Sequence, residues 1–305
     1  MRPLLLAAAI AVFAGPTIVA QSVAPAALTA AEIMAKVAAN QDRTEAARTH
    51  YIYQQHIRIA SRKPGGKMMC EEVTDSRVSP QQKESQQQLL TLDGRLWHKG
   101  RYVHYTKLPD EKDEADGINV SIGGDDPMDR DLVESLRWNL ADDKSKDGLG
   151  KGLFPLTTQQ QSQYLFTLEG RQTMNGRDVY RVSFRPKDKN DFDWKGEAFI
   201  DAHEFEPVVV YTEMSRKMPL AVRTLLGTNL PGLGFSVTYD REPEGVWFPV
   251  SFGTEFRMRV LFFLARDISM SLANTHFEKT HSGVRILDGV KMVDNATPSS
   301  PTAAH

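Results

Sequence analysis

Residues 194–212 read WKGEAFIDAHEFEPVVVYT, and this stretch decides the fold class. Phe199-Ile200 and the run from Val208 to Tyr211 are residue types that favour strands. The acidic segment between them, which contains Pro207, is typical of a turn. Residues 235–252 repeat the arrangement, with DREPEG between FSVTY and VWFPVSF. Two successive hairpins of this kind predict an antiparallel meander.

The strand pattern extends in both directions from this stretch. Apolar and polar residues alternate over 51–59, and further strands are expected over 67–78, 86–92 and 96–105. Asp93-Gly94 is expected to form the tight turn between the last two. Asn175-Gly176 predicts another hairpin, and alternation continues from 246 to 277. The sequence therefore predicts a mainly β (α+β) fold, a large curved antiparallel sheet or half-open β-barrel.

A few helices are expected to cover the concave side of this sheet. Thr29 and Glu32 have the spacing of a capping box, and the apolar residues that follow recur at helical spacing to about Arg48. A second helix is expected after Asp126 and Pro127, with leucines at every fourth position. The apolar segment 219–226 is also helix-like and could pack over an open end of the sheet.

The N-terminus has the order of a secretory signal peptide: Arg2, an apolar run from Leu4 to Val19, and then small residues. We expect cleavage after Ala20, or less favourably after Ala24, and export to a bacterial periplasm. The apolar run is shorter than the ~20 residues that span a membrane. The expected organisation is a signal peptide over 1–20, a linker over 21–28, one β domain over 29–287 and a disordered tail over 288–305.

Composition excludes some classes of protein. The chain has 305 residues and a formal net charge of −2, so there is no excess positive charge for nucleic acid. Cys70 is the sole cysteine of the sequence, which excludes an intramolecular disulfide and a lipid-bearing cysteine beside the signal peptide.

No segment matches a motif of catalysis or metal binding. Residues 143–148 resemble the start of a calcium loop, but Phe154 stands where a glutamate ligand is required. Two pairs of histidines, 50 with 56 and 98 with 104, share strand faces without a third ligand. Glu197 and Asp201 are read as strand-face charges in preference to an acid/base pair. We therefore expect no enzyme activity, no metal and no cofactor.

Large apolar side chains are the remaining candidates for a binding site in the sequence. Most of them must fill the core, but a curved sheet with helices across its concave side can also leave a cavity for an apolar ligand. The expected pocket residues are Tyr53, Leu220, Leu225, Leu226, Trp247, Phe252, Phe256 and Met258.

The segments LEGRQTMNGRDVYRVSF, WKGEAFIDAHEFEPVVVY and EGVWFPVSF, in this order after two helices and a meander, resemble a known family. They are similar to bacterial outer-membrane lipoprotein-sorting proteins of the LolA/LolB-like superfamily, in a longer periplasmic branch. The resemblance covers residues 29–277. It implies a half-open barrel closed by helices, whose apolar interior receives acyl chains.

The resemblance and the apolar residues together predict a periplasmic, non-catalytic carrier for a lipid or lipoprotein acyl group. The segment 220–226 would be its movable cover. An alternative is an envelope sensor or assembly partner that uses the sheet to dock a membrane or envelope protein, with the apolar run 260–265 as the contact. A hydrolase assembled from distant residues is the third hypothesis.

Overall fold

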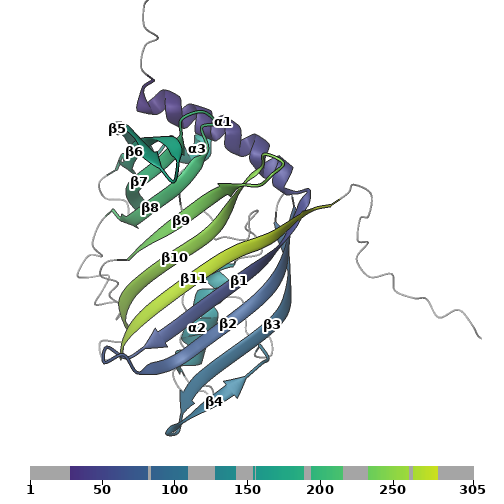
Figure 1. Ribbon diagram of the computed structural model, residues 1–305. Coiled ribbons are helices and arrows are strands. Elements are labelled where there is room, and N and C mark those ends of the chain that lie inside the picture. The colour runs from purple at the N-terminus through teal and green to yellow at the C-terminus, as the bar shows by residue number, and fades with distance from the viewer. Residues whose placement is uncertain are drawn as a thin grey trace, which may run out of the picture.

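The alternating segments of the sequence form strands of one antiparallel sheet in a computed structural model of the chain (Figure 1). The structure describes residues 28–81, 84–108, 128–141, 154, 156–188, 194–215, 233–260 and 264–280. The strands are β1 (Tyr51–Arg62), β2 (Met68–Pro80), β3 (Ser85–His98), β4 (Arg101–Tyr105), β5 (Tyr164–Met174), β6 (Arg177–Pro186), β7 (Trp194–Asp201), β8 (Pro207–Met214), β9 (Gly234–Arg241), β10 (Trp247–Val260) and β11 (Leu264–Lys279).

The eleven strands lie in the order β4-β3-β2-β1-β11-β10-β9-β8-β7-β6-β5. Two meanders, one from each half of the chain, are thus joined where β1 pairs with β11 in the middle of the sheet. The two edge strands are β4 and β5, which follow one another in sequence. The chain between them must pass from one edge of the sheet to the other, and α2 (Met128–Leu140) lies in this crossover.

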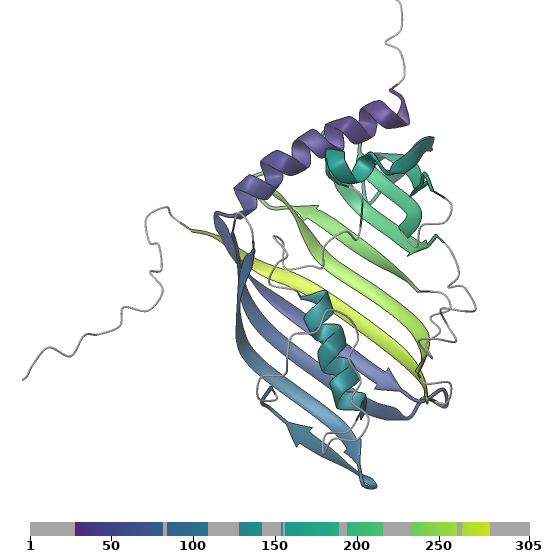
Figure 2. The same ribbon diagram turned by 180° about the vertical axis from the view of Figure 1, so that it is seen from behind.

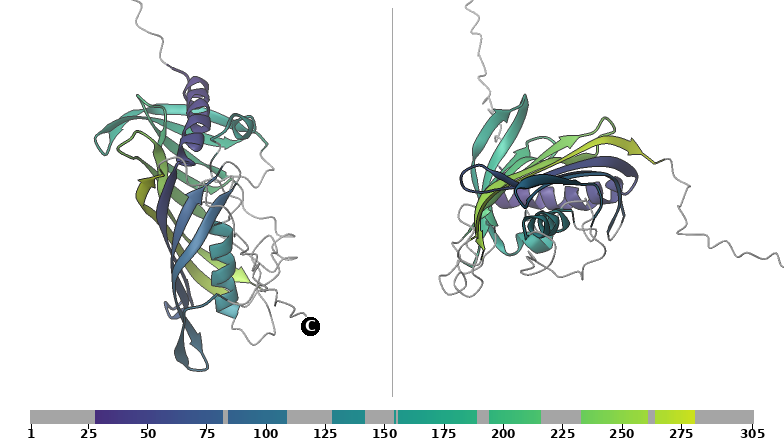
Figure 3. Two further views of the ribbon diagram at one scale, coloured as in Figure 1. Left: turned by 90° about the vertical axis from the view of Figure 1, so that its right-hand side faces the viewer. Right: turned by 90° about the horizontal axis from the view of Figure 1, so that it is seen from below.

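The sheet is curved and is not closed into a barrel, and its helices lie on the concave side (Figures 2 and 3). The helix α2 packs over β1 and β2, whereas α1 (Ala30–Arg48) crosses one end of the sheet near β5. A short third helix, α3 (Thr158–Gln161), lies beside α1. The predicted fold class is confirmed, although α3 was not expected.

Local signals in the sequence place most of these elements. Thr29 and Glu32 form the predicted capping box at the start of α1. The predicted hairpin turn joins β5 to β6, where Asn175 and Gly176 both have positive φ, at 51° and 77°. The helix α2 begins at Met128, and the expected capping residues before it lie outside the described residues, as does the segment 219–226.

The predicted turn at Asp93-Gly94 is wrong. These residues lie inside β3, which continues to His98, and the chain turns at Lys99-Gly100 instead. Gly94 faces the ring of Tyr105 on β4, and a β-carbon at this position would overlap that ring. The glycine therefore allows a close approach between two strands and has no role in reversing the chain.

A second strand glycine supports a prediction about stability. A β-carbon on Gly196 of β7 would overlap the backbone carbonyl oxygen of Tyr211 on the neighbouring strand. Gly196→Ala is expected to lower the free energy of unfolding by about 2–3 kcal/mol, because the two backbones must move apart. Urea denaturation would measure the change.

Gly253 on β10 is the matched control for this substitution. It also lies in the sheet, but an added β-carbon would meet the Ser236 hydroxyl at an ordinary 3.7 Å. Gly253→Ala is therefore expected to change the stability by less than about 1 kcal/mol. Equal losses at both glycines would contradict the proposed close approach at Gly196.

Candidate functional site

The concave face of the sheet carries a continuous row of mostly apolar side chains. The cross-strand register aligns one residue from each of ten strands on this face. From the β5 side to β3 the row is Leu168, Val182, Ala198, Val210, Val237, Phe252, Leu272, Ile57, Thr74 and Leu92. Thr74 is the single polar member of the row. The face is therefore an apolar surface that extends across most of the sheet.

The structure places four of the predicted pocket residues in this main apolar cluster: Trp247, Phe252, Phe256 and Met258. All four are buried, and the stacked rings of Phe235 and Phe252 lie 5.5 Å apart between β9 and β10. Leu220, Leu225 and Leu226 lie outside the described residues.

Tyr53 belongs to a second, smaller cluster, in which its ring packs against Phe248 and Phe277. A buried polar layer separates the two clusters along β1 and β11. There, the Gln55 side-chain amide donates to Asn274 over 3.2 Å, and the Asn274 amide donates to the Pro249 carbonyl over 2.8 Å. The sequence does not reveal this layer, because Gln55 continues the alternation of β1.

Two ion pairs attach α2 to the sheet, one buried and one partly buried. At its N-terminal turn, both carboxylate oxygens of Asp129 accept from the Arg266 guanidinium on β11, over 2.6 and 2.8 Å. The hydroxyl of Ser61 on β1 donates to the same carboxylate over 2.8 Å. At the other end of α2, Arg137 donates to Glu72 of β2 over 2.6 Å.

Apolar residues of α2 fill the space between these pairs. Leu132, Val133, Leu136 and Leu140 are buried in the main cluster, which agrees with the predicted leucine spacing. The signs of the charges also match the helix dipole, since the acidic residue lies in the first turn and the basic residue in the last. The helix is thus a fixed cover over the β1 and β2 part of the concave face.

Glu72 is also the centre of a buried polar cluster beneath α2. Its second carboxylate oxygen accepts from the Tyr105 hydroxyl over 3.1 Å, and that hydroxyl lies 3.5 Å from the Cys70 sulfur. Burial raises the pKa of the Tyr105 hydroxyl well above its usual range and raises that of the Cys70 thiol to about 12. Both groups are therefore protonated at neutral pH, and the thiol is a poor nucleophile.

This burial predicts the reactivity of the cysteine. At pH 8 a thiol with a pKa of about 12 has roughly a thousandfold less thiolate than one with the ordinary pKa of 9.0, even before solvent access is considered. Labelling of Cys70 by a maleimide is expected to be slower by at least this factor in the folded protein than in urea. Mass spectrometry of timed samples would measure both rates. Comparable rates would show that the thiol is not enclosed beneath α2.

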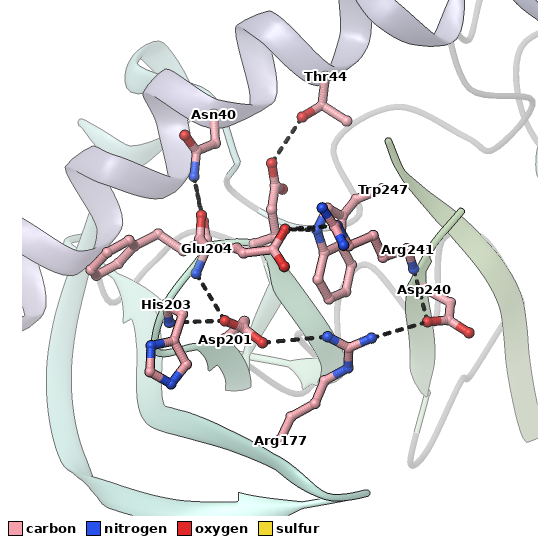
Figure 4. A network of polar contacts seen from close by, with 11 residues as sticks. Asn40, Thr44, Arg177, Asp201, His203, Glu204, Asp240, Arg241 and Trp247 are labelled. Atoms are coloured by element: carbon pink, nitrogen blue, oxygen red, sulfur yellow. Dashed lines mark hydrogen bonds and ion pairs between the residues drawn. The ribbon is translucent and has the colours of Figure 1, made fainter. Parts of the chain in front are cut away.

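A different polar network surrounds Trp247 at the end of the sheet that α1 crosses (Figure 4). The indole N–H donates to Glu204 over 2.9 Å, and the Arg177 guanidinium lies 4.9 Å from the ring centroid. The backbone carbonyl of Trp247 accepts from Arg48 of α1 over 2.6 Å. The ring is thus buried between the apolar cluster and the polar contacts that hold α1.

The turn between β7 and β8, expected from its acidic residues, completes this network. The Asp201 carboxylate accepts from the backbone N–H groups of His203 and Glu204, each over 2.8 Å (Figure 4). Glu206 is buried and accepts from Gln41 and Thr44 of α1, over 2.7 and 2.8 Å. Burial raises the pKa of Glu206, opposed by the hydrogen bond from Thr44. Asp201 thus holds the turn itself, and Glu206 fixes it to α1. A hollow of about 360 Å³ lies beside Glu204 and Glu206.

Another hollow, of about 650 Å³, lies on the outer face of the sheet, where Arg58, Arg62 and Gly253 form part of its lining. Most of its lining residues are polar or charged, and it lies opposite the apolar row. Among the described residues, no three His, Cys, Asp or Glu side chains are grouped so that they could hold a metal ion. Within the same ranges, no helix is long and apolar enough to cross a membrane.

No family model and no curated protein matches the sequence. The fold is similar to those of several solved structures. One is a DUF1329 family protein from Desulfovibrio piger, with 9% sequence identity and a TM-score of 0.39. The alignment covers 84% of this chain and 96% of the Desulfovibrio protein. The likeness concerns the fold alone.

Two further solved structures are similar in the same way. An outer membrane lipoprotein-sorting protein domain from Vibrio parahaemolyticus has 13% identity and a TM-score of 0.36, over 81% of this chain and 93% of that one. A LolA superfamily protein from Nitrosomonas europaea has 12% identity and a TM-score of 0.34, over 85% and 96%.

Proposed function

We propose that this protein is an exported, periplasmic and non-catalytic carrier that binds the acyl chain of a lipid or lipoprotein. The observation that supports the proposal best is the apolar row across ten strands of an open sheet. A surface of this length matches an extended hydrocarbon chain better than a compact polar metabolite.

The way in which α2 is attached also supports a carrier. If α2 were held by apolar contacts alone, an acyl chain that displaced one of its contacting side chains would weaken its attachment. The pairs Asp129–Arg266 and Glu72–Arg137 do not depend on those contacts and hold the helix at both ends. A ligand could therefore enter beside α2 without releasing it.

The proposed mechanism is burial without covalent chemistry. Each methylene removed from water contributes ~0.8 kcal/mol, so a partly enclosed acyl chain would be held reversibly. Phe252, Phe256 and Met258 are proposed as walls of the site on β10. Tyr53 and Trp247 are proposed to line its end near α1, and Leu220, Leu225 and Leu226 to act as the cover.

Two measurements test the carrier. Native mass spectrometry of the exported protein is expected to show co-purified lipid. A dansyl-labelled fatty acid is then expected to bind the delipidated protein with one site and to be displaced by unlabelled lipid. A protein without bound lipid that leaves the fluorescence of the probe unchanged would refute the proposal.

A pair of substitutions locates the site on the concave face. Phe252→Leu, in the apolar row, is expected to weaken binding of the probe about tenfold, since it removes part of an aromatic wall. Tyr211→Leu is the control, because Tyr211 is 50% exposed and lies away from that row. Equal effects of the two substitutions would place the probe elsewhere.

The alternative function, an envelope partner that docks a protein on the sheet, rests on the open edges. The edge strand β4 exposes Tyr102 and Val103, and none of the described strands pairs with its outer backbone groups. The apolar run at 260–265, which was expected to make the contact, includes residues 261–263 outside the described part of the chain. Binding of a membrane protein without bound lipid would favour this alternative.

A further inference from the structure

Two turns, at residues 63–67 and 99–100, and the paired ends of β10 and β11 lie at one end of the sheet and gather cationic side chains there. The antiparallel register places the ends of β1, β3 and β10 and the starts of β2, β4 and β11 at this end. In Figure 1 it is the lower left margin of the sheet. We call it the basic edge and define it by Arg62, Lys63, Lys67, Lys99, Arg101 and Arg259.

Positive charge exceeds negative charge at the basic edge among the described residues, where Glu255 and Asp267 line a hollow together with Arg62. None of its six residues has an ion pair within the described ranges, and the side chains of all but Arg62 are exposed. Arg257 and Arg266 lie at the same end, but their charges are balanced by Asp267 and by Asp129 of α2. The chain as a whole has a net charge of −2, so this concentration of positive charge is local.

At the opposite end of the sheet, most acidic side chains are paired with cations. Asp240 near the end of β9 and Asp201 at the end of β7 both lie near Arg177. In the turns that follow, Glu244 pairs with Lys279 and Glu204 with Arg241. The two ends therefore differ in pairing among the described residues: unpaired cations gather at the basic edge, whereas most of these carboxylates have cationic partners. A negatively charged surface would be approached with the basic edge forward.

Two aromatic rings lie beside the cations of the basic edge. Trp97 and Tyr102 pair across β3 and β4 with their ring centroids 5.0 Å apart, and Tyr102 is 41% exposed. The Lys67 ammonium lies 3.4 Å from the centroid of the Trp97 ring. Tryptophan and tyrosine beside lysine and arginine form the combination that lies at the headgroup level of membranes.

We propose that the basic edge docks the protein onto the surface of a bilayer rich in anionic phospholipid. The cations would contact phosphate groups, and the Trp97 and Tyr102 rings would lie among the headgroups. An acidic protein could satisfy the charges, but it would give no reason for an exposed Tyr102 beside a half-buried Trp97. The proposal does not rest on the carrier function, because it concerns a different part of the sheet from the apolar row.

Vesicle co-sedimentation of the delipidated protein tests this proposal. At low salt the protein is expected to bind vesicles of phosphatidylglycerol and phosphatidylcholine, and not vesicles of phosphatidylcholine alone. Binding is expected to fall steeply between 50 and 300 mM NaCl, because the contacts lie at the surface and are screened. The triple variant K63Q/K99Q/R101Q is expected to lose on the order of a hundredfold in partition.

The matched control removes three exposed cations elsewhere, as K36Q/R185Q/K187Q. It has the same net charge as the test variant and is expected to bind anionic vesicles like the unmodified protein. Equal losses in the two variants, or no binding of the unmodified protein to anionic vesicles, would overturn the proposal. Binding to polyglutamate without binding to vesicles would assign the edge to an acidic protein and would also overturn it. Vesicle binding without binding of the fatty-acid probe would refute the carrier function alone.

Discussion

Asp129→Ala is expected to lower the free energy of unfolding by about 3–5 kcal/mol, the cost of breaking a buried ion pair by removing one partner. The side chains of Asp129 and Arg266 are only 8% and 7% exposed, and the aspartate accepts both guanidinium hydrogen bonds. Its loss would leave the Arg266 charge buried beneath α2. Urea denaturation would measure the loss, and faster maleimide labelling of Cys70 would show that α2 has loosened.

Asp267→Ala is the control for this prediction. Asp267 also pairs with an arginine at the same end of the sheet, Arg257, but the two side chains are 35% and 57% exposed. Exposed pairs contribute roughly 0–1 kcal/mol, so a small change is expected. The double variant Asp129→Ala/Arg266→Met is expected to recover part of the stability, because it removes the unpaired charge. Similar losses for Asp129→Ala and Asp267→Ala would show that α2 does not depend on the buried pair.

Trp247→Ala is expected to cost about 3–5 kcal/mol of stability, the range for removing a large buried aromatic side chain. The ring is 2% exposed, and its removal would also leave Glu204 without the indole hydrogen bond. Trp138→Ala on α2 is the control, since Trp138 is 43% exposed, and it is expected to cost less than about 1 kcal/mol. Thermal unfolding followed by circular dichroism would rank the two variants.

The same Trp247 variant separates an anchoring role from a lining role. If the ring mainly holds α1 and the turn between β7 and β8, the folded fraction of Trp247→Ala will bind the fatty-acid probe with unchanged affinity. If the ring also lines the acyl site, the affinity will fall together with the stability. Fluorescence titration well below the unfolding temperature distinguishes these outcomes.

The parts of the fold that depend on near neighbours in sequence could be predicted. Alternating residues, the Asn175-Gly176 turn and the Thr29–Glu32 capping box each act over a few residues, and each is present in the structure. The pairing of β1 with β11 could not be predicted, because it joins residues more than 200 positions apart without a local signal. Gly94 was misread for a related reason, since its neighbour Tyr105 lies on another strand.

Less of the candidate site than of the fold could be predicted from the sequence. Apolar residues on alternate positions predict a lined face, and Phe252, Phe256 and Met258 lie in the main cluster as their spacing indicates. The buried charges that hold α2 were missed, because Glu72, Asp129 and Arg266 look like surface residues in a sequence. The sequence did contain one indication of these buried charges. It is a charged residue at a strand position that faces the core, such as Glu72 in β2.

The position of β1 in the middle of the sheet has a consequence for biosynthesis. Its partner β11 is the last strand to leave the ribosome, so the growing chain holds two incomplete half-sheets, each with an unpaired inner edge. Long-range pairing of this kind is slow to form and prone to aggregate. A nascent chain that stops before residue 264 would lack the joining strand altogether. This protein is therefore expected to need protection by a chaperone until its synthesis is complete.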